Sequence, residues 1–546
     1  MSSKSTGQVY GRARRLGPFL LPLVLVGGVA FDNGGFDATT WGWSTLVPLI
    51  VVGVALAAGA ARRPSNLALG FLGLLAALTA WTFGSVAWSD DVSQSVLDGE
   101  RLLVYLAAVA ALLVFERRQV ESLLWGLLAA ITVVCAWALC LRVFGGAGSY
   151  DIAVSPGSTR RLAAPLGYSN GLGVFAAIGV LLAGGLSVRL RSVTAAAPLL
   201  VLLPTLYFTY SRGAWLALAA GAVAAIALGR PRVPKAVAVA GAVVIVAGLT
   251  VALVRVGGPA GAVRKFSGVG PTIKTGQNRR LLSLSGSSRA QYWHVAWLEY
   301  QEHPWLGTGA GSFQRHWLRL RPAELPVLDA HSLYLETLAE LGPVGLALLV
   351  AALTLPLVAS VLARDDPVAV PAVGGYVAYL VHAAQDWDWE LPAVTLAGLV
   401  CAAALLVLAE RRPRPQLPPS LRVGAAAITV VLALAALGAL AGNQAVSGAN
   451  AALDRDDPAR AERDARWAER LVPWSPEPWR LHGEALLSQG KLDAARRDFR
   501  RALVKDPSDW DSWADLTLVT QGAERREAAR RARSLNPLEQ VLPTGD

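Results

Sequence analysis

The chain is dominated by apolar stretches, each close to the ~20 residues that a helix needs to cross a lipid bilayer. Such a helix satisfies all its backbone hydrogen bonds internally, which is the condition for burial in lipid. We place thirteen of these stretches at about 16–31, 43–60, 67–87, 101–115, 121–144, 171–187, 193–209, 213–229, 235–256, 334–362, 368–385, 391–409 and 421–443. The first also resembles a signal peptide, but no convincing small-residue cleavage site follows it, so we treat it as a span.

The composition supports a membrane protein. The 546 residues are 54% hydrophobic and 16% charged, which is more apolar sequence than a water-soluble domain can bury. The net charge of +11 is spread in short basic clusters between apolar segments. This distribution is typical of membrane topology and argues against nucleic-acid binding. The 3 cysteines lie in apolar runs without metal-ligand spacing, so we expect buried thiols. The sequence therefore predicts an all-α fold, a polytopic transmembrane helical bundle.

The distribution of lysine and arginine predicts the orientation of the bundle. With the N-terminus in the cytoplasm, the short outer connections hold three basic residues, Arg160, Arg161 and Arg212. The inner connections hold Lys4, Arg12, Arg14, Arg15, Arg62, Arg63, Arg117, Arg118, Arg189, Arg191, Arg230, Arg232, Lys235, Arg364, Arg411, Arg412 and Arg414. Under the positive-inside rule, this asymmetry places the connections at 145–169 and 257–333, and the C-terminal tail, outside the cytoplasm. We expect a multi-pass protein of the cytoplasmic (inner) membrane.

The chain is expected to have three parts. They are a basic cytoplasmic N-terminus at 1–15, a membrane domain at 16–449 that includes the large extracytoplasmic loop 257–333, and an extracytoplasmic tail at 450–546. In the tail, Pro473 and Pro507 are 34 residues apart, as are Trp479 and Trp513. This period is typical of tetratricopeptide repeats, and a degenerate remainder ends near Pro537. The tail is either a groove that binds a protein partner or a helical cap that helps the chain to fold.

Ionisable residues near membrane depth are costly, so their gathering on the outer side indicates chemistry. Arg161, Arg212, Arg289 and five of the 6 histidines map there. Guanidinium groups bind phosphate oxygens through paired hydrogen bonds and can neutralise a departing diphosphate. A histidine can take the proton of an acceptor hydroxyl. The alternatives are an arginine that snorkels to lipid headgroups and a histidine that is only structural.

Two aspartates, Asp386 and Asp388, follow a late apolar stretch in the segment VHAAQDWDWELPAV. At this spacing they could hold a divalent metal against phosphates. They could instead pair with an arginine of the outer loop, orient His331, or lie in a solvated turn. The sequence leaves these alternatives open.

Three segments around the large outer loop carry a resemblance to a known family. They are SRGAW at 211–215, the stretch from Arg289 through PWLGTGAGSF, and HSLYLETLAELGPVG from His331. In this order they resemble the signature motifs of the O-antigen ligase and O-antigen polymerase superfamily, most specifically over 205–350. The segment RRLAAPLGYSNGLGVF is similar to the arginine and asparagine element of that family.

The resemblance implies a GT-C-like glycosyltransferase fold, an undecaprenyl-diphosphate-linked glycan donor and metal-independent transfer without a cofactor. Carried over by motif, Arg212, Arg289 and Arg161 bind the donor diphosphate, and His331 activates the acceptor hydroxyl. Asn170 and the two aspartates have supporting roles, and the expected outcome is inversion at the transferred sugar. The acceptor, which could be a glycan, a lipid or a protein, stays open, as does the choice between ligation and polymerisation.

Two other classes of function fit parts of the sequence. A polysaccharide or lipid transporter, or flippase, would carry ionisable residues at mid-span, inverted repeats and broken helices. Here the charges cluster at one face, and the two halves show no evident symmetry. A membrane-anchored scaffold for cell-envelope assembly would act through its repeat tail. That interpretation predicts that deletion of residues 450–546 removes all function, whereas the enzyme interpretation predicts that transfer is retained or redirected.

Overall fold

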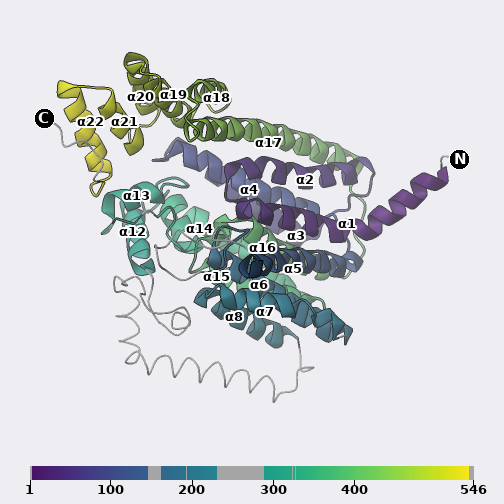
Figure 1. Cartoon of the computed structure of the whole chain (residues 1–546). Helices are drawn as coiled ribbons and strands as arrows, with labels where there is room; N and C mark the ends of the chain where they lie inside the picture. Colours follow the sequence, from purple (N-terminus) through teal and green to yellow (C-terminus); the bar gives the residue numbers. More distant parts are fainter. Residues whose placement is uncertain are drawn as a thin grey trace, which may run out of the picture.

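In the computed structural model the chain is all-α, which confirms the predicted fold class (Figure 1). The structure describes residues 3–144, 161–191, 193–229, 288–322, 324–325 and 327–539, with side chains from Leu16 onward. Within those ranges the β structure is limited to an isolated antiparallel bridge between Arg62 and Gln416. The apolar stretch predicted at 235–256 and the outer residue Arg160 lie outside the described residues.

Twelve of the predicted apolar stretches coincide with helices. These are α1 (Ser3–Phe31), α2 (Ala38–Ala57), α3 (Asn66–Gly84), α4 (Val92–Leu112), α5 (Val120–Phe144), α6 (Ser169–Leu190), α7 (Leu199–Phe208), α8 (Arg212–Leu228), α14 (Leu333–Leu362), α15 (Ala369–Ala383), α16 (Pro392–Leu408) and α17 (Pro419–Leu453). Short 3₁₀ helices lie between them at Asn33–Gly35, Ser85–Ala87, Arg117–Gln119, Thr194–Ala196 and Asp388–Glu390. Among the described residues, 6 helical segments are long and apolar enough to cross a membrane, in α2, α3, α5, α6, α14 and α17. Multiple apolar helices are consistent with a multi-pass membrane protein, while the total of thirteen spans stays a prediction.

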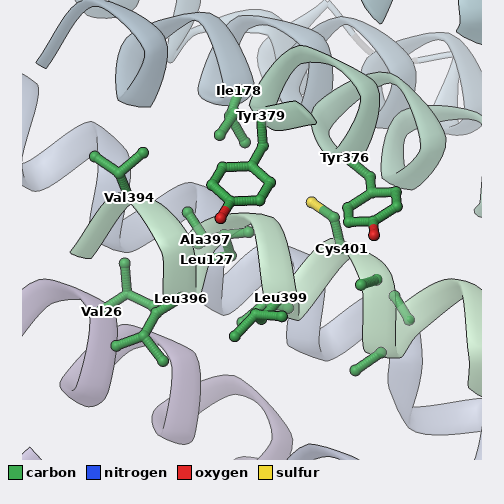
Figure 2. Packing of buried hydrophobic residues seen from close by; sticks show 14 of the residues in the cluster. Val26, Leu127, Ile178, Tyr376, Tyr379, Val394, Leu396, Ala397, Leu399 and Cys401 are labelled. Atoms are coloured by element: carbon green, nitrogen blue, oxygen red, sulfur yellow. The ribbon is translucent and has the colours of Figure 1, made fainter. Parts of the chain in front are cut away.

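Helix α16 forms the centre of the bundle. All 17 of its residues are buried, and it packs against α1, α4, α5, α6, α14 and α15. Figure 2 shows side chains of α1, α5, α6 and α15 around it. Its sequence, PAVTLAGLVCAAALLVL, is apolar on every side, which is the pattern of a helix surrounded by other helices. Its small residues allow close packing, as at Gly398, where an added Cβ would lie 2.6 Å from the Tyr379 ring. Cys401 on this helix and Cys135 on α5 are buried as predicted, but Cys140 is exposed.

The basic connections that the sequence groups on the inner side do gather at one end of the bundle. They line a cavity of about 590 Å³. The arginines around it are Arg62, Arg117, Arg118, Arg189, Arg411, Arg412 and Arg414. Ion pairs join neighbouring connections there, for example Arg117 with Asp366 at 2.9 Å and Arg189 with Glu121 at 2.6 Å. The grouping of these connections is therefore observed, and their placement in the cytoplasm stays a prediction.

Two short helices, α12 (Arg289–Glu302) and α13 (Phe313–Leu320), form an outer layer at the other end of α4 (Figure 1). Asp91, just before α4, contacts Arg315 of α13, whereas Glu116, after α4, lines the basic cavity. The layer has its own small core, in which the Tyr292 and Trp317 rings meet edge to face at 4.9 Å. The GTGAG turn at 307–311 joins the two helices, and its three glycines all have positive φ, a conformation that glycine adopts without steric cost.

The C-terminal tail is helical and continues directly from α17. Its helices are α18 (Pro458–Leu471), α19 (Glu477–Ser488), α20 (Leu492–Lys505), α21 (Trp510–Leu518) and α22 (Gly522–Leu535). Helices α18 and α20 begin and end 34 residues apart, so the sequence period appears as a structural period. Helix α17 crosses the predicted boundary at residue 450 unbroken, and Ala445 on it packs against Ala468 and Val472 after the boundary. The assignment of this array to the tetratricopeptide class stays a prediction.

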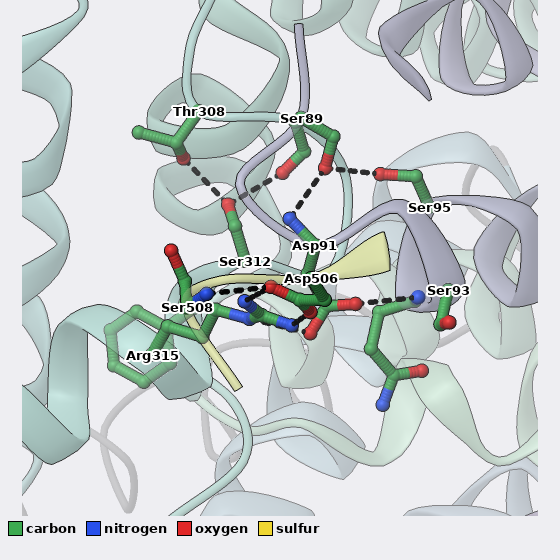
Figure 3. A network of polar contacts seen from close by, with 12 residues as sticks. Ser89, Asp91, Ser93, Ser95, Thr308, Ser312, Arg315, Asp506 and Ser508 are labelled. Carbon is green, nitrogen blue, oxygen red and sulfur yellow. Dashed lines mark hydrogen bonds and ion pairs between the residues drawn. The ribbon is translucent and has the colours of Figure 1, made fainter. Parts of the chain in front are cut away.

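The tail docks on the outer layer through a network of polar contacts (Figure 3). Arg315 of α13 donates from Nε to Asp91 at 2.8 Å and from Nη1 to Asp506 of the tail at 2.8 Å. Its Nη2 makes a further contact with Asp506. Ser93 at the start of α4 donates to Ser475 of the tail at 2.9 Å. One guanidinium therefore links three parts of the chain, and charge-assisted contacts of this kind are the stronger class of hydrogen bond.

We expect the Arg315→Ala variant to loosen the tail from the outer layer. The substitution leaves two largely buried carboxylates, Asp91 and Asp506, without their shared partner. Limited proteolysis in detergent should release the tail faster from this variant than from the wild-type protein. Arg319→Ala, which removes an exposed ion pair with Glu302, is the matched control and should leave the cleavage pattern unchanged. Equal cleavage of the Arg315 variant and the wild type would contradict the docking.

Candidate functional site

Asp386 lies where several of the predicted site residues meet. It is 1% exposed and sits in the connection between α15 and α16. Its carboxylate accepts hydrogen bonds from Arg289 at 2.6 Å, Asn170 at 2.8 Å and Tyr168 at 2.7 Å. Burial raises the pKa of the Asp386 carboxyl, but the charge of the Arg289 guanidinium and the hydrogen bond from Tyr168 help to hold the pKa below its ordinary value. Asp386 is therefore ionised and anchors Arg289.

Arg161 and Asn170 extend this network toward α8. Arg161 is 4% exposed. It donates from Nη2 to Asn170 Oδ1 and from Nε to the Thr209 carbonyl oxygen at 2.8 Å. Asn170 therefore accepts from Arg161 with its oxygen and donates to Asp386 with its amide nitrogen, which fixes the orientation of its side chain. The network connects the segment before α6 to the segment before α8.

Arg212 is the first residue of α8. The helix starts there because Ser211 acts as its cap, with Oγ accepting a hydrogen bond from the N–H of Ala214. The Arg212 guanidinium is close enough to those of Arg289 and Arg161 to be repelled by both. The structure thus brings together the three arginines that the sequence proposes as diphosphate ligands.

His331 lies in the turn before α14 and is partly buried. Its Nδ1 is 3.0 Å from the carbonyl oxygen of Asp329. Because a carbonyl only accepts hydrogen bonds, Nδ1 carries the hydrogen and Nε2 is the basic nitrogen. Burial lowers the pKa of His331 to about 4, while Asp386 raises it and Arg289 lowers it to smaller extents. The ring is therefore neutral at neutral pH, and its charge state responds to Arg289 and Asp386.

Three buried carboxylates hold the turn that carries His331. Asp329, Glu336 and Glu390 place one oxygen each within 4.8 Å of one another. Glu336 accepts the backbone N–H of Ala330 at 2.7 Å, and Arg101 pairs with Glu390 at 2.9 Å. Burial, and then Glu390, raise the pKa of Asp329 well above its ordinary value. Carboxylates at this spacing can hold a cation, and here retained protons and Arg101 also balance their charge.

Asp388 does not share the contacts of Asp386. Its Oδ1 lies 2.9 Å from Nδ1 of His382 at the end of α15, and both side chains are 1% exposed. Among the alternatives that the sequence leaves open, Asp386 follows the one in which an aspartate pairs with an arginine of the outer loop. Neither aspartate lies in a solvated turn, because both side chains are buried among the described residues.

Three further side chains belong to this site, and the sequence reasoning did not select them. Tyr168 donates to Asp386 and packs on Trp387, with ring centroids 4.5 Å apart. His382 and Gln385 approach the first turn of α8. His382 is one of several histidines that map to the outer side, and only the packing of α15 against α8 distinguishes it from the others.

We expect Asp386→Ala to lower the stability of the protein. The substitution leaves the Arg289 guanidinium, which is 18% exposed, without its carboxylate, and breaking a buried pair costs about 3–5 kcal/mol. The melting temperature in detergent should fall by several degrees. Asp365→Ala removes an exposed pair with Arg411 and should change the stability by less than about 1 kcal/mol. A wild-type melting temperature for Asp386→Ala would mean that this network contributes nothing to stability.

Comparison with known proteins identifies the part of the chain that contains these residues. Residues 197–350 match the protein-family model described as O-Antigen ligase. No curated protein matches the chain. The matched range includes Arg212, Arg289 and His331, the residues that begin the three motifs of the sequence resemblance or lie within them. The resemblance is therefore confirmed for this region, and the chain contains an O-antigen ligase family domain.

Proposed function

We propose that the chain is a membrane glycosyltransferase that moves a glycan from an undecaprenyl-diphosphate-linked donor to an acceptor hydroxyl at the extracytoplasmic face. The O-antigen ligase family implies glycosyltransferase activity of the ligation or polymerisation kind. The observation that supports the finer proposal is the gathering of Arg161, Arg212 and Arg289 at one end of the bundle, where the charge of Arg289 also reaches His331. Such an arrangement can bind a diphosphate and remove a proton close to it.

The charge balance of the site favours an anionic ligand. Arg212 is repelled by both Arg161 and Arg289, and Asp386 makes its ion pair with Arg289. A diphosphate would relieve the repulsion that Arg212 experiences and would find cations already held in position. Preorganised charges of this kind stabilise a transition state without reorganisation during the reaction.

In the proposed reaction, Nε2 of His331 takes the proton of the acceptor hydroxyl while the oxygen attacks the anomeric carbon. The bond between that carbon and the diphosphate oxygen breaks, and the electron pair stays on the diphosphate. Arg212 and Arg289 neutralise the charge that develops on the leaving group. Attack on the face opposite the leaving group inverts the anomeric configuration. Guanidinium groups supply the positive charge in this scheme, so no metal ion is needed for it.

The position of the C-terminal tail supports a role for it in recruiting a protein partner or the acceptor. It docks on α13, in the same outer layer as the helix that begins with Arg289. A partner or acceptor bound to the tail would therefore be held near the proposed site. The tail could instead be a purely structural cap. Deletion of the tail distinguishes the two roles, because loss of a recruiting tail should change which product forms.

We expect Arg212→Ala, Arg289→Ala and His331→Ala each to lower glycan transfer by at least ~100-fold, because each removes charge stabilisation or the base. The assay combines purified protein in lipid nanodiscs with an undecaprenyl-diphosphate-linked glycan and candidate acceptors, and identifies the product by mass spectrometry. His294→Ala and Arg319→Ala are controls, since both side chains are exposed in the same outer region. Transfer should persist in the presence of a chelator. Full activity of His331→Ala would exclude the histidine as the base.

The pH dependence of kcat/KM provides a second test. Burial lowers the pKa of His331 to about 4 from the ordinary value of 6.5, so the basic form persists as the solution is acidified to about pH 5. The pH dependence of kcat/KM reports ionisations of the free enzyme. The midpoint of the loss of kcat/KM in acid should therefore lie well below pH 6. Return of each sample to pH 7 with recovery of activity separates titration from unfolding. An acid limb near pH 6.5 would contradict the buried, neutral base.

A further inference from the structure

Two buried nitrogen atoms in the site have no hydrogen-bond partner among the described residues. They are Nε2 of His382 and Nε2 of Gln385. The His382 side chain is 1% exposed. Buried polar atoms are nearly always hydrogen-bonded, and an unpaired one costs about 1–3 kcal/mol. Two such atoms beside the same helix turn indicate a ligand that forms hydrogen bonds with both.

Both atoms converge on the first turn of α8. A Cβ added to Gly213 would lie 3.0 Å from Nε2 of His382 and 3.3 Å from Nε2 of Gln385. Gly213 follows Arg212 directly, at the N-terminus of a 17-residue helix. The N-terminal end of a helix attracts anions, because its first N–H groups point outward and its dipole is positive there. Because it has no side chain, Gly213 lets both nitrogens approach the backbone at the start of α8, whereas a side chain there would press on them.

The second nitrogen of the His382 ring determines what this ligand can be. Nδ1 of His382 lies 2.9 Å from the Asp388 carboxylate, which can only accept, so Nδ1 carries a hydrogen. The buried carboxylate also stabilises the imidazolium form, in which Nε2 carries a hydrogen as well. In this form Nε2 of His382, together with the Gln385 amide, offers hydrogen bonds to an anionic oxygen.

We propose that His382 and Gln385, with the first turn of α8, bind a phosphate oxygen of the polyprenyl-diphosphate donor. This inference rests on the proposed function and adds two donor-binding residues to it, both beside Gly213 in the first turn of α8. Asp388 acts as a positioning residue, since it holds the His382 ring with Nε2 toward Gly213. His382 donates a hydrogen bond and keeps its proton, while His331 remains the base of the reaction.

The test measures binding of undecaprenyl diphosphate to the purified full-length chain in nanodiscs, with undecaprenol as the uncharged comparison. His382→Leu should weaken binding of the diphosphate by about 10- to 100-fold, as expected for loss of a hydrogen bond to a charged group. His382→Gln, which keeps a donor, should retain most of the affinity. Binding of undecaprenol should be equal in all variants. His303→Leu, at an exposed histidine of the outer layer, is the matched control and should bind the diphosphate like the wild type.

A second variant keeps the test decisive if His382→Leu fails to fold. Gly213→Ala adds one methyl group between α8 and the two nitrogens and should also weaken diphosphate binding selectively. Gly73→Ala is its control, because an added Cβ there meets nothing within 4 Å. Wild-type affinity in both His382→Leu and Gly213→Ala would overturn this inference and leave the proposed function intact. No binding of the diphosphate by the wild-type chain would overturn the proposed function itself.

Discussion

The buried ion pair between Arg289 and Asp386 is the interaction on which the rest of the site depends. Arg289 begins α12 in the outer layer, and Asp386 lies in the connection between two helices of the bundle. A buried ion pair is stable only when further hydrogen bonds satisfy its remaining atoms. Tyr168 and Asn170 provide them to the carboxylate. The pair thus joins the outer layer to the end of the bundle, and Asn170 links Arg161 to it.

The arrangement separates two kinds of positive charge. At one end of the bundle, arginines line a wide cavity and alternate with carboxylates such as Glu121 and Asp366, which pair with them. At the other end, Arg212 experiences the charges of Arg161 and Arg289, and Asp386 pairs with Arg289. The first pattern is what membrane topology alone requires. The second brings cations from separate segments near one another, and perturbed ionisable groups of this kind are common at functional sites.

The sequence predicts the helices well, because lipid imposes both their length and their composition. Twelve of the apolar stretches coincide with helices, and the 34-residue period of the tail reappears in the spacing of α18 and α20. The motifs also select arginines that the fold brings together. What the sequence does not predict depends on contacts between distant segments: the pairing of Asp386 with Arg289, the contact of Asp388 with His382, and the docking of Asp506 on Arg315. No periodicity encodes such contacts, since they arise only when helices pack at defined angles.

The most direct test of the account is a structure of the chain with undecaprenyl diphosphate bound in a nanodisc. The account predicts density for the diphosphate between the guanidinium groups of Arg212 and Arg289, within hydrogen-bond distance of both, with Nε2 of His331 facing the space where the sugar would continue. A diphosphate bound at the basic cavity around Arg62 and Arg414 instead, with the site between α8 and α12 left without ligand, would contradict it.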